Sequence, residues 1–171
     1  NPEATAAAID RDGWFHTGDA GYLKDSHLYL TERIKDLFKT SNGKYISPQA
    51  LETKLAIDRY IDQIAVIADE RKFVSALIVP VYGFVKDYAK EKGIAYSNMD
   101  ELLQHPKIQA LFRARIDTLQ QQFAHYEQVK RFTLLTEPFS MERGELTNTL
   151  KLKRSVVAKN YKGLIDKMYE E

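Results

Sequence analysis

No cysteine occurs among the 171 residues of this chain, which excludes both a disulfide framework and a metal site built from thiolates. Long apolar runs are also missing, and none approaches the roughly 18 residues that a membrane-spanning helix needs. No signal-peptide pattern opens the chain. Glycine is scarce, with 8 residues, and ionic residues are common. These features suit a reducing cytoplasm, and we expect that location.

An excess of charge of either sign is lacking as well. Lys and Arg together number 25 and Asp and Glu 24, so the net charge of +1 gives no reason to expect a nucleic-acid partner. Apolar residues make up 44% and charged residues 29%, an ordinary composition for a globular protein. The length allows one domain with a substantial core, or a small domain with an appendage.

The first residues are Asn1-Pro2-Glu3, without an initiating Met. We therefore expect an excised fragment of a larger protein. The segment Gly21 to Thr31 reads as a hairpin around the polar turn Lys24-Asp25-Ser26. Residues 1–32 are interpreted as the tail end of a larger, missing N-terminal domain, and residues 33–171 as a separate C-terminal domain.

Three apolar segments in the second part predict strands. Two of them, 64–68 and 74–81, are separated by a charged turn and predict a central hairpin, and 129–135 is the third. Helical spacing predicts helices over 82–92, from about 106 to 123, and over one final stretch near 157–168. The predicted fold class is α+β: a small three-stranded, mainly antiparallel sheet with packed helices, preceded by the hairpin.

Three polar segments are poorly explained by a core. Asp19, in Thr17-Gly18-Asp19, suits either the hydroxyls of a ribose or a simple Asx turn. The ionic run Arg33-Ile34-Lys35-Asp36 suits either a solvated connector or a hinge with ligand contacts. Lys151, in the Thr-rich segment 144–154, could reach a carboxylate and a phosphate together, or could simply open a basic helix.

No metal site is predicted, because the four histidines show no metal-ligand spacing: His16, His27, His105 and His125. The pair Gly43-Lys44 is similar to the end of a phosphate loop. However, Tyr45 stands where that motif requires Ser or Thr, so it is not a Walker sequence.

Taken together and in order, the three segments resemble the adenylate-forming (AMP-binding) superfamily, and specifically the C-terminal domain of long-chain fatty-acid–CoA ligases. The stretch 14–19, Trp-Phe-His-Thr-Gly-Asp, is similar to the family's W-[YF]-x-T-G-D motif. The stretch from Arg33 through Gly43, Ile46 and Pro48 to Glu52 matches its hinge motif. The stretch 146–154 resembles the LTxTxKLKR form of its last motif.

The resemblance implies a role for each of five residues. Asp19 would bind the ribose hydroxyls of ATP with help from Arg33, and Lys35 would be the hinge about which the small domain rotates. Lys151 would be the catalytic lysine that bridges the substrate carboxylate and the α-phosphate. The loop around Gly43 would line the pantetheine channel. ATP, Mg²⁺ and CoA are the implied cofactors and substrates, with a fatty acid as the acyl donor.

Two positions depart from the family pattern. The last motif commonly has Gly before the lysine, and this chain has Leu150. Long-chain members usually carry Pro where this chain has Asn148. Because long-chain members tolerate the loss of the Gly, the first departure favours that subclass and leaves the predicted function in place.

The predicted activity is that of an acid–thiol ligase, which converts fatty acid, ATP and CoA to acyl-CoA, AMP and pyrophosphate through an acyl-adenylate. The family's phosphate loop and acyl pocket would lie upstream of Asn1, so we expect the fragment alone to be inactive. One alternative is a ligase that loads a carrier protein. Another is a non-catalytic interaction domain that docks a partner or an anionic membrane, since residues 151–171 carry six Lys or Arg against three Asp or Glu.

Overall fold

The computed structural model describes residues 1–170, apart from the side chains of Thr31, Glu32 and Lys35. The side chain of Lys35, the predicted hinge residue, therefore lies outside the described part of the structure. The chain forms two compact units, Asn1–Leu37 and Phe38–Glu171. None of the described helices is long and apolar enough to cross a bilayer.

The first unit is built on a β-hairpin. It contains α1 (Pro2–Ala8), β1 (Asp19–Lys24), β2 (His27–Arg33) and the short 3₁₀ helix η1 (Ile34–Asp36). Asp25 and Ser26 form the two-residue turn, with φ of 49° and 61°, as a tight hairpin turn requires. The antiparallel register pairs Asp19 at the start of β1 with Arg33 at the end of β2. The hairpin predicted from the sequence is therefore present.

The second unit is organised around a three-stranded sheet in the order β5 (Ile61–Ile67), β6 (Val74–Pro80) and β7 (Val129–Leu134). Strand β6 is buried along its whole length because it lies in the middle and is covered on both faces, which explains its continuous apolar sequence. It is antiparallel to β5 and parallel to β7. The parallel pair arises because a long helical crossover separates β6 from β7 in the chain. The predicted α+β fold with three strands is confirmed.

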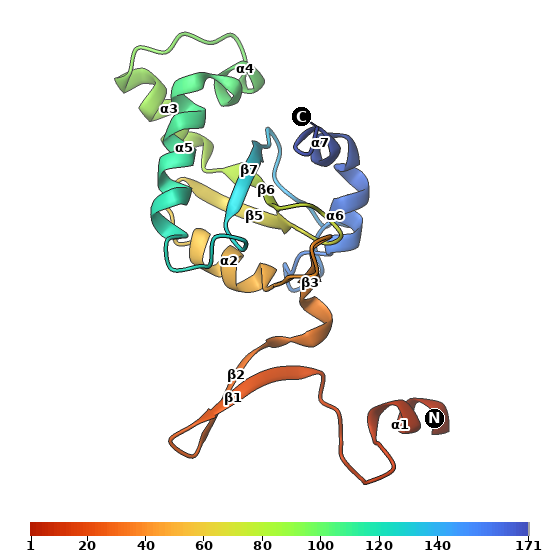
Figure 1. The fold of residues 1–171 in the computed structure, drawn as a ribbon. Helices are drawn as coiled ribbons and strands as arrows, with labels where there is room; N and C mark the ends of the chain where they lie inside the picture. Colours follow the sequence, from red (N-terminus) through yellow and green to blue (C-terminus); the bar gives the residue numbers. More distant parts are fainter. Residues whose placement is uncertain (171) are drawn as a thin grey trace. The chain divides into compact units, whose positions relative to one another are not determined.

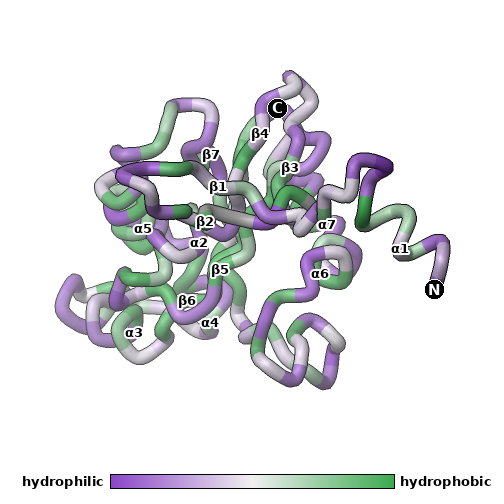
Figure 2. Tube along the Cα trace, turned by 90° about the horizontal axis from the view of Figure 1, so that it is seen from below, coloured by the Kyte–Doolittle hydropathy of each residue, from purple (hydrophilic) through white to green (hydrophobic). Residues whose placement is uncertain are grey.

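Helices cover both faces of this sheet (Figure 1). One core cluster lies between the sheet and α2 (Pro48–Leu55), α3 (Tyr82–Glu91), α4 (Met99–Gln104) and α5 (Pro106–Leu119). The other lies between the sheet and α6 (Arg154–Asn160) with α7 (Lys162–Lys167). Neighbouring residues of β6 serve opposite clusters: Ile78 belongs to the first and Leu77 to the second. Figure 2 shows the apolar character running along β5 and β6.

The final helical stretch differs from the prediction. The sequence predicts one helix, but the structure has two, α6 and α7, separated at Tyr161, whose φ is −103° and ψ 17°. Asn160 and Gly163 flank the break, and both are weak helix formers. The apolar stripe is still used as predicted, because Val157, Ile165 and Met168 all contribute to the second core cluster.

Candidate functional site

Asp19 and Arg33 form an ion pair in the first unit. Nε of Arg33 lies 2.7 Å from Oδ1 of Asp19, and the register of β1 and β2 places the two residues opposite each other. Gly18, with φ of +75°, turns the chain just before Asp19. The hydroxyl of Thr17 accepts a hydrogen bond from the backbone N–H of Asp19. The two residues predicted to bind the ribose are thus brought together by the hairpin.

The backbone of Lys35 lies in η1, at the end of the first unit. The 3₁₀ turn is closed by a hydrogen bond from the N–H of Leu37 to the carbonyl of Ile34. Only two residues separate Lys35 from Phe38, the first residue of the second unit. Its role as a hinge stays a prediction.

Gly43 lies in a tight turn between β3 (Phe38–Lys39) and β4 (Tyr45–Ile46). The N–H of Gly43 donates to the carbonyl of Thr40, and the backbone of Thr40 pairs with that of Lys44. Gly43 has φ of +76°, and a Cβ added there would meet no atom within 4 Å. The turn therefore needs glycine for its backbone conformation, and the surface around Gly43 is open. The N–H of Ser41 donates to the carbonyl of Arg71, which attaches this loop to the β5–β6 turn.

Lys151 lies in a small hairpin that spans residues 146–152. The backbone N–H of Thr147 donates to the carbonyl of Lys151 at 2.8 Å, and Leu146 and Leu152 form an antiparallel bridge. The hydroxyl of Thr147 accepts hydrogen bonds from the backbone N–H groups of Lys151 and Thr149. Leu150 completes the turn with φ of +59°, a left-handed conformation that favours glycine. This is the position at which the family pattern commonly has Gly.

The side chain of Lys151 is exposed on this hairpin. Among residues 38–170 of the second unit, no carboxylate forms an ion pair with its ammonium group. A positive charge on a backbone that is closed by its own hydrogen bonds can stabilise negative charge on an incoming ligand. The geometry therefore suits the role of Lys151, which stays a prediction.

Two ion pairs hold the segment that contains Lys151, and sequence reasoning assigned a role to neither. Before the hairpin, the carboxylate of Glu145 is completely buried and pairs with Arg143 at 3.0 Å. After it, Arg154 at the start of α6 donates both ends of its guanidinium to Glu52 of α2. The sequence did contain a signal for the second pair, because Glu52 ends the hinge motif and Arg154 ends the last motif. Nothing local distinguishes Glu145 from an exposed loop carboxylate.

Burial alone raises the pKa of the Glu145 carboxyl group. Hydrogen bonds from the guanidinium of Arg143, the backbone N–H of Ser140 and the amide of Asn160 outweigh it, so the pKa lies below its ordinary value. Glu145 is therefore ionised at neutral pH. The protein keeps a buried carboxylate charged six residues before Lys151.

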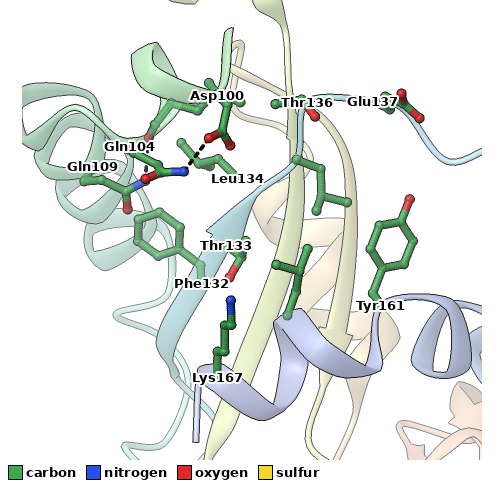
Figure 3. Close-up of a pocket in the computed structure, with 13 residues that line it drawn as sticks. Asp100, Gln104, Gln109, Phe132, Thr133, Leu134, Thr136, Glu137, Tyr161 and Lys167 are labelled. Atoms are coloured by element: carbon green, nitrogen blue, oxygen red, sulfur yellow. Dashed lines mark hydrogen bonds between the residues drawn. The ribbon is translucent and has the colours of Figure 1, made fainter. Parts of the chain in front are cut away.

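A separate hollow of about 440 Å³ lies along the free edge of β7 (Figure 3). Asp100 and Gln104 of α4 lie on one side of it, and Tyr161 and Lys167 lie on the other. Neither Gly43 nor Lys151, the predicted site residues of the second unit, lines this hollow. Elsewhere, the described residues contain no group of three or more His, Asp or Glu side chains that could hold a metal ion.

Comparison with known proteins agrees with the motifs. Long chain acyl-CoA synthetase 7, peroxisomal, of Arabidopsis thaliana is 35% identical over 173 residues, which cover 99% of this chain and 25% of the relative. Long-chain-fatty-acid–CoA ligase 5 of Rattus norvegicus is 36% identical over 177 residues, again 99% of this chain and 25% of the relative. The chain thus spans about a quarter of the length of these curated relatives.

Among solved structures, the adenylation domain of the carboxylate reductase from Mycobacterium chelonae has a similar fold. Its TM-score is 0.79 at 25% identity, and the match covers 99% of this chain and 25% of that one. Residues 35–171 also match a family described as the AMP-binding enzyme C-terminal domain. The resemblance inferred from the three motifs is thereby confirmed, and the chain belongs to the family of AMP-binding enzyme C-terminal domains.

Proposed function

We propose that this chain is the C-terminal part of a long-chain fatty-acid–CoA ligase. In the first step, an oxygen of the fatty-acid carboxylate attacks the α-phosphorus of ATP, and the bond to pyrophosphate breaks. In the second step, the thiol sulfur of CoA attacks the acyl carbonyl, its proton is lost, and AMP leaves. The identities of about 35% to long-chain relatives across the whole chain support this substrate class.

Lys151 acts in the first step. Its ammonium group stabilises the negative charge shared by the attacking carboxylate and the α-phosphate, as a preorganised cation does in other charge-developing reactions. The observation that carries this assignment is the exposed cation on a closed hairpin. The N–H of Thr147 donates to the carbonyl of Lys151, and the hydroxyl of Thr147 accepts from the N–H of Lys151.

The remaining predicted residues serve binding and rotation. Asp19 accepts hydrogen bonds from the ribose hydroxyls of ATP, and Arg33, whose Nε lies 2.7 Å from Oδ1 of Asp19, orients this carboxylate. Lys35 is the pivot of the small domain. The open surface at Gly43 faces the pantetheine arm in the second step. ATP brings its own Mg²⁺, and no step is assigned to a metal held by this chain.

The chain by itself is inactive, because the acyl pocket and the phosphate loop belong to the missing N-terminal domain, which is its partner in the whole enzyme. The proposed location is the cytoplasm. The basic segment 151–171 would make any peripheral contact with an anionic membrane. Co-sedimentation with anionic vesicles at low and moderate salt tests that contact. ATP- and CoA-dependent thioester formation by the isolated chain would contradict its inactivity.

The test uses the full-length parent protein with Lys151→Ala. Adenylate formation from fatty acid and ATP, and thioester formation from supplied acyl-adenylate, are measured separately. We expect adenylation to fall by about 10²-fold or more, as when one preorganised charge donor is removed, and thioester formation to survive. Lys153→Ala is the matched control, because Lys153 is also exposed and stands only two residues away. An unchanged adenylation rate in Lys151→Ala contradicts the assignment.

A ligase that loads a carrier protein is the second candidate. It is favoured by the likeness to the adenylation domain of a carboxylate reductase, at 25% identity. The two candidates are distinguished by giving the enzyme–acyl-adenylate complex CoA in one reaction and a carrier protein in another, and by measuring acyl transfer in each. Transfer to CoA supports the first candidate, and transfer only to the carrier supports the second.

A further inference from the structure

The carboxylate of Glu145 is a buried charge that the proposed mechanism does not use. Its residue is 0% exposed. Oε2 accepts a hydrogen bond from the backbone N–H of Ser140 at 3.0 Å, and Oε1 accepts one from the amide of Asn160 at 3.2 Å. Nε of Arg143 lies 3.1 Å from both oxygens. The carboxylate therefore joins the loop after β7 to the end of α6.

This arrangement is an expensive way to stabilise a fold. The side chain of Arg143 is 38% exposed, but that of Glu145 is only 1% exposed, so it is the carboxylate that loses its contact with water. Burying such a charge is unfavourable, and an apolar side chain of similar size often stabilises a protein equally well or better. What the ion pair does provide is one specific geometry, since each oxygen of Glu145 has its own donors. A charge retained here points to a need for precise placement of the segment that follows.

That segment is the Lys151 hairpin, and Glu145 opens it. The carbonyl of Glu145 accepts a hydrogen bond from the N–H of Lys153 at 2.8 Å. The bridge between Leu146 and Leu152 follows, and then the Thr147–Lys151 pair closes the turn. These successive cross-links connect the fixed backbone of Glu145 to the backbone of Lys151.

We propose that Glu145 is a positioning residue for adenylation, holding the hairpin so that Lys151 reaches the carboxylate and the α-phosphate together. This inference rests on the proposed function of Lys151. Glu145 touches no substrate and acts through Lys151 alone. Its loss therefore affects the step that uses Lys151 and spares the step that does not.

The experiment compares Glu145→Gln with Glu137→Gln in the full-length parent protein. Glu137 is the matched control because it pairs with the same Arg143, at 3.3 Å, but its side chain is 74% exposed. We expect Glu145→Gln to lower kcat for adenylation about 10- to 100-fold, the cost of a small misplacement of a catalytic group. KM for ATP and fatty acid, and the rate of thioester formation from supplied acyl-adenylate, stay the same. Glu137→Gln changes none of these quantities.

The double variant with Lys151→Ala separates positioning from general damage. If Glu145 acts through Lys151, adding Glu145→Gln to Lys151→Ala causes no further loss of adenylation. A loss that multiplies with that of Lys151→Ala overturns the proposal, as does an equal fall in both half-reactions. If Lys151→Ala alone leaves adenylation unchanged, it is the proposed function that fails. If only Lys151→Ala is impaired, the positioning role alone fails.

Asn160→Ala covers the case in which Glu145→Gln does not fold. Asn160 donates one hydrogen bond to Glu145 at the end of α6, and removing its side chain leaves the Glu145–Arg143 pair intact. We expect a selective fall in adenylation of several-fold, smaller than for Glu145→Gln, with an unchanged melting temperature within about 3 °C. If Glu145→Gln does not fold and Asn160→Ala keeps full adenylation activity, the positioning role of Glu145 is overturned.

Discussion

Arg154 and Glu52 form a two-point ion pair across 102 residues of chain, with Nη1–Oε1 and Nη2–Oε2 distances of 2.5 and 2.6 Å. Glu52 also accepts a hydrogen bond from the backbone N–H of Val66 in β5. The guanidinium of Arg154 lies over the ring of Phe38. The start of α6, and with it the exit from the Lys151 hairpin, is thus tied to α2 and to the sheet.

Arg154→Ala should lower the free energy of unfolding of the chain by about 1–3 kcal/mol, as expected when hydrogen bonds to a charged group are lost. The side chain of Glu52 is only 13% exposed, so its charge would remain partly buried without its cation. Glu52→Ala should cost more, because the N–H of Val66 then loses its acceptor as well. Urea unfolding of the two variants and of the double variant measures the coupling.

Lys162→Ala is the control for this pair. Nζ of Lys162 lies 2.5 Å from Oδ2 of Asp166, but the side chain of Lys162 is 74% exposed, and solvent screens an exposed pair so that it contributes little to stability. Equal losses in Lys162→Ala and Arg154→Ala would show that the connection between α2 and α6 is no stronger than an ordinary surface pair.

Leu150→Gly should stabilise the chain. Leu150 has φ of +59° and is 68% exposed, so a glycine there relieves the left-handed backbone and loses little packing. The relief of about 1–2 kcal/mol is partly offset by about 0.5–1 kcal/mol of added freedom in the unfolded chain. We expect a net gain of about 0.5–1 kcal/mol in urea unfolding.

Leu150→Val tests the same backbone conformation with a substitution that should lower the stability. A β-branched residue tolerates the left-handed region poorly, so this variant should lose stability. If Leu150→Gly destabilises and Leu150→Val is neutral, the hairpin does not hold Leu150 in the left-handed region in solution.

The strands of the sheet in the second unit could be predicted because each one is a short apolar run of neighbouring residues in the sequence. Strand β6 is covered on both faces, and its residues from Val74 to Pro80 are all buried, so a continuous apolar run was sufficient evidence. The parallel pairing of β7 with β6 depends on the path of the crossover, which periodicity does not report. The break at Tyr161 was missed because the apolar stripe continues through it.

The candidate residues that belong to sequence motifs could be identified from the sequence. The residues that depend on tertiary contacts could not. Asp19, Gly43 and Lys151 lie in or next to turns whose residue types are visible in the sequence: Asp19 begins β1 just after the turn at Gly18, and Lys151 follows the turn residue Leu150. The donors to Glu145 come from two separate segments, Ser140 to Arg143 and the end of α6, so its burial depends on the folded arrangement. A carboxylate in a polar loop otherwise indicates an exposed residue.

Gly43→Ala should lower the free energy of unfolding by about 1 kcal/mol, because φ of +76° is unfavourable for a residue with a Cβ. Gly83→Ala is the matched control: it lies in α3, where a Cβ also meets nothing within 4 Å and φ is not positive. That variant should gain roughly 0.5–1 kcal/mol, since alanine is the better helix former. Chemical denaturation of both checks the sign, and similar effects at the two positions would contradict the turn conformation of Gly43.

The stability of the chain should fall in acid partly through Glu145. Burial raises the pKa of this carboxyl group, but the hydrogen bonds from Arg143, Ser140 and Asn160 outweigh it and lower the pKa below the ordinary value of 4.5. Because the folded pKa lies below the unfolded one, the carboxylate contributes stability above pH 4.5, and this contribution is lost as the pH falls through the folded pKa.

Glu145→Gln should therefore be less stable than the unchanged chain at neutral pH, and the difference should shrink below pH 4.5. Urea unfolding of both proteins at a series of pH values from neutral to acid measures this convergence. Glu137→Gln, whose side chain is 74% exposed, should follow the unchanged chain throughout. If the gap between Glu145→Gln and the unchanged chain stays constant through the acid range, the lost stability comes from the amide NH₂ group, which cannot accept the hydrogen bonds that a carboxyl oxygen accepts, and not from the lost charge.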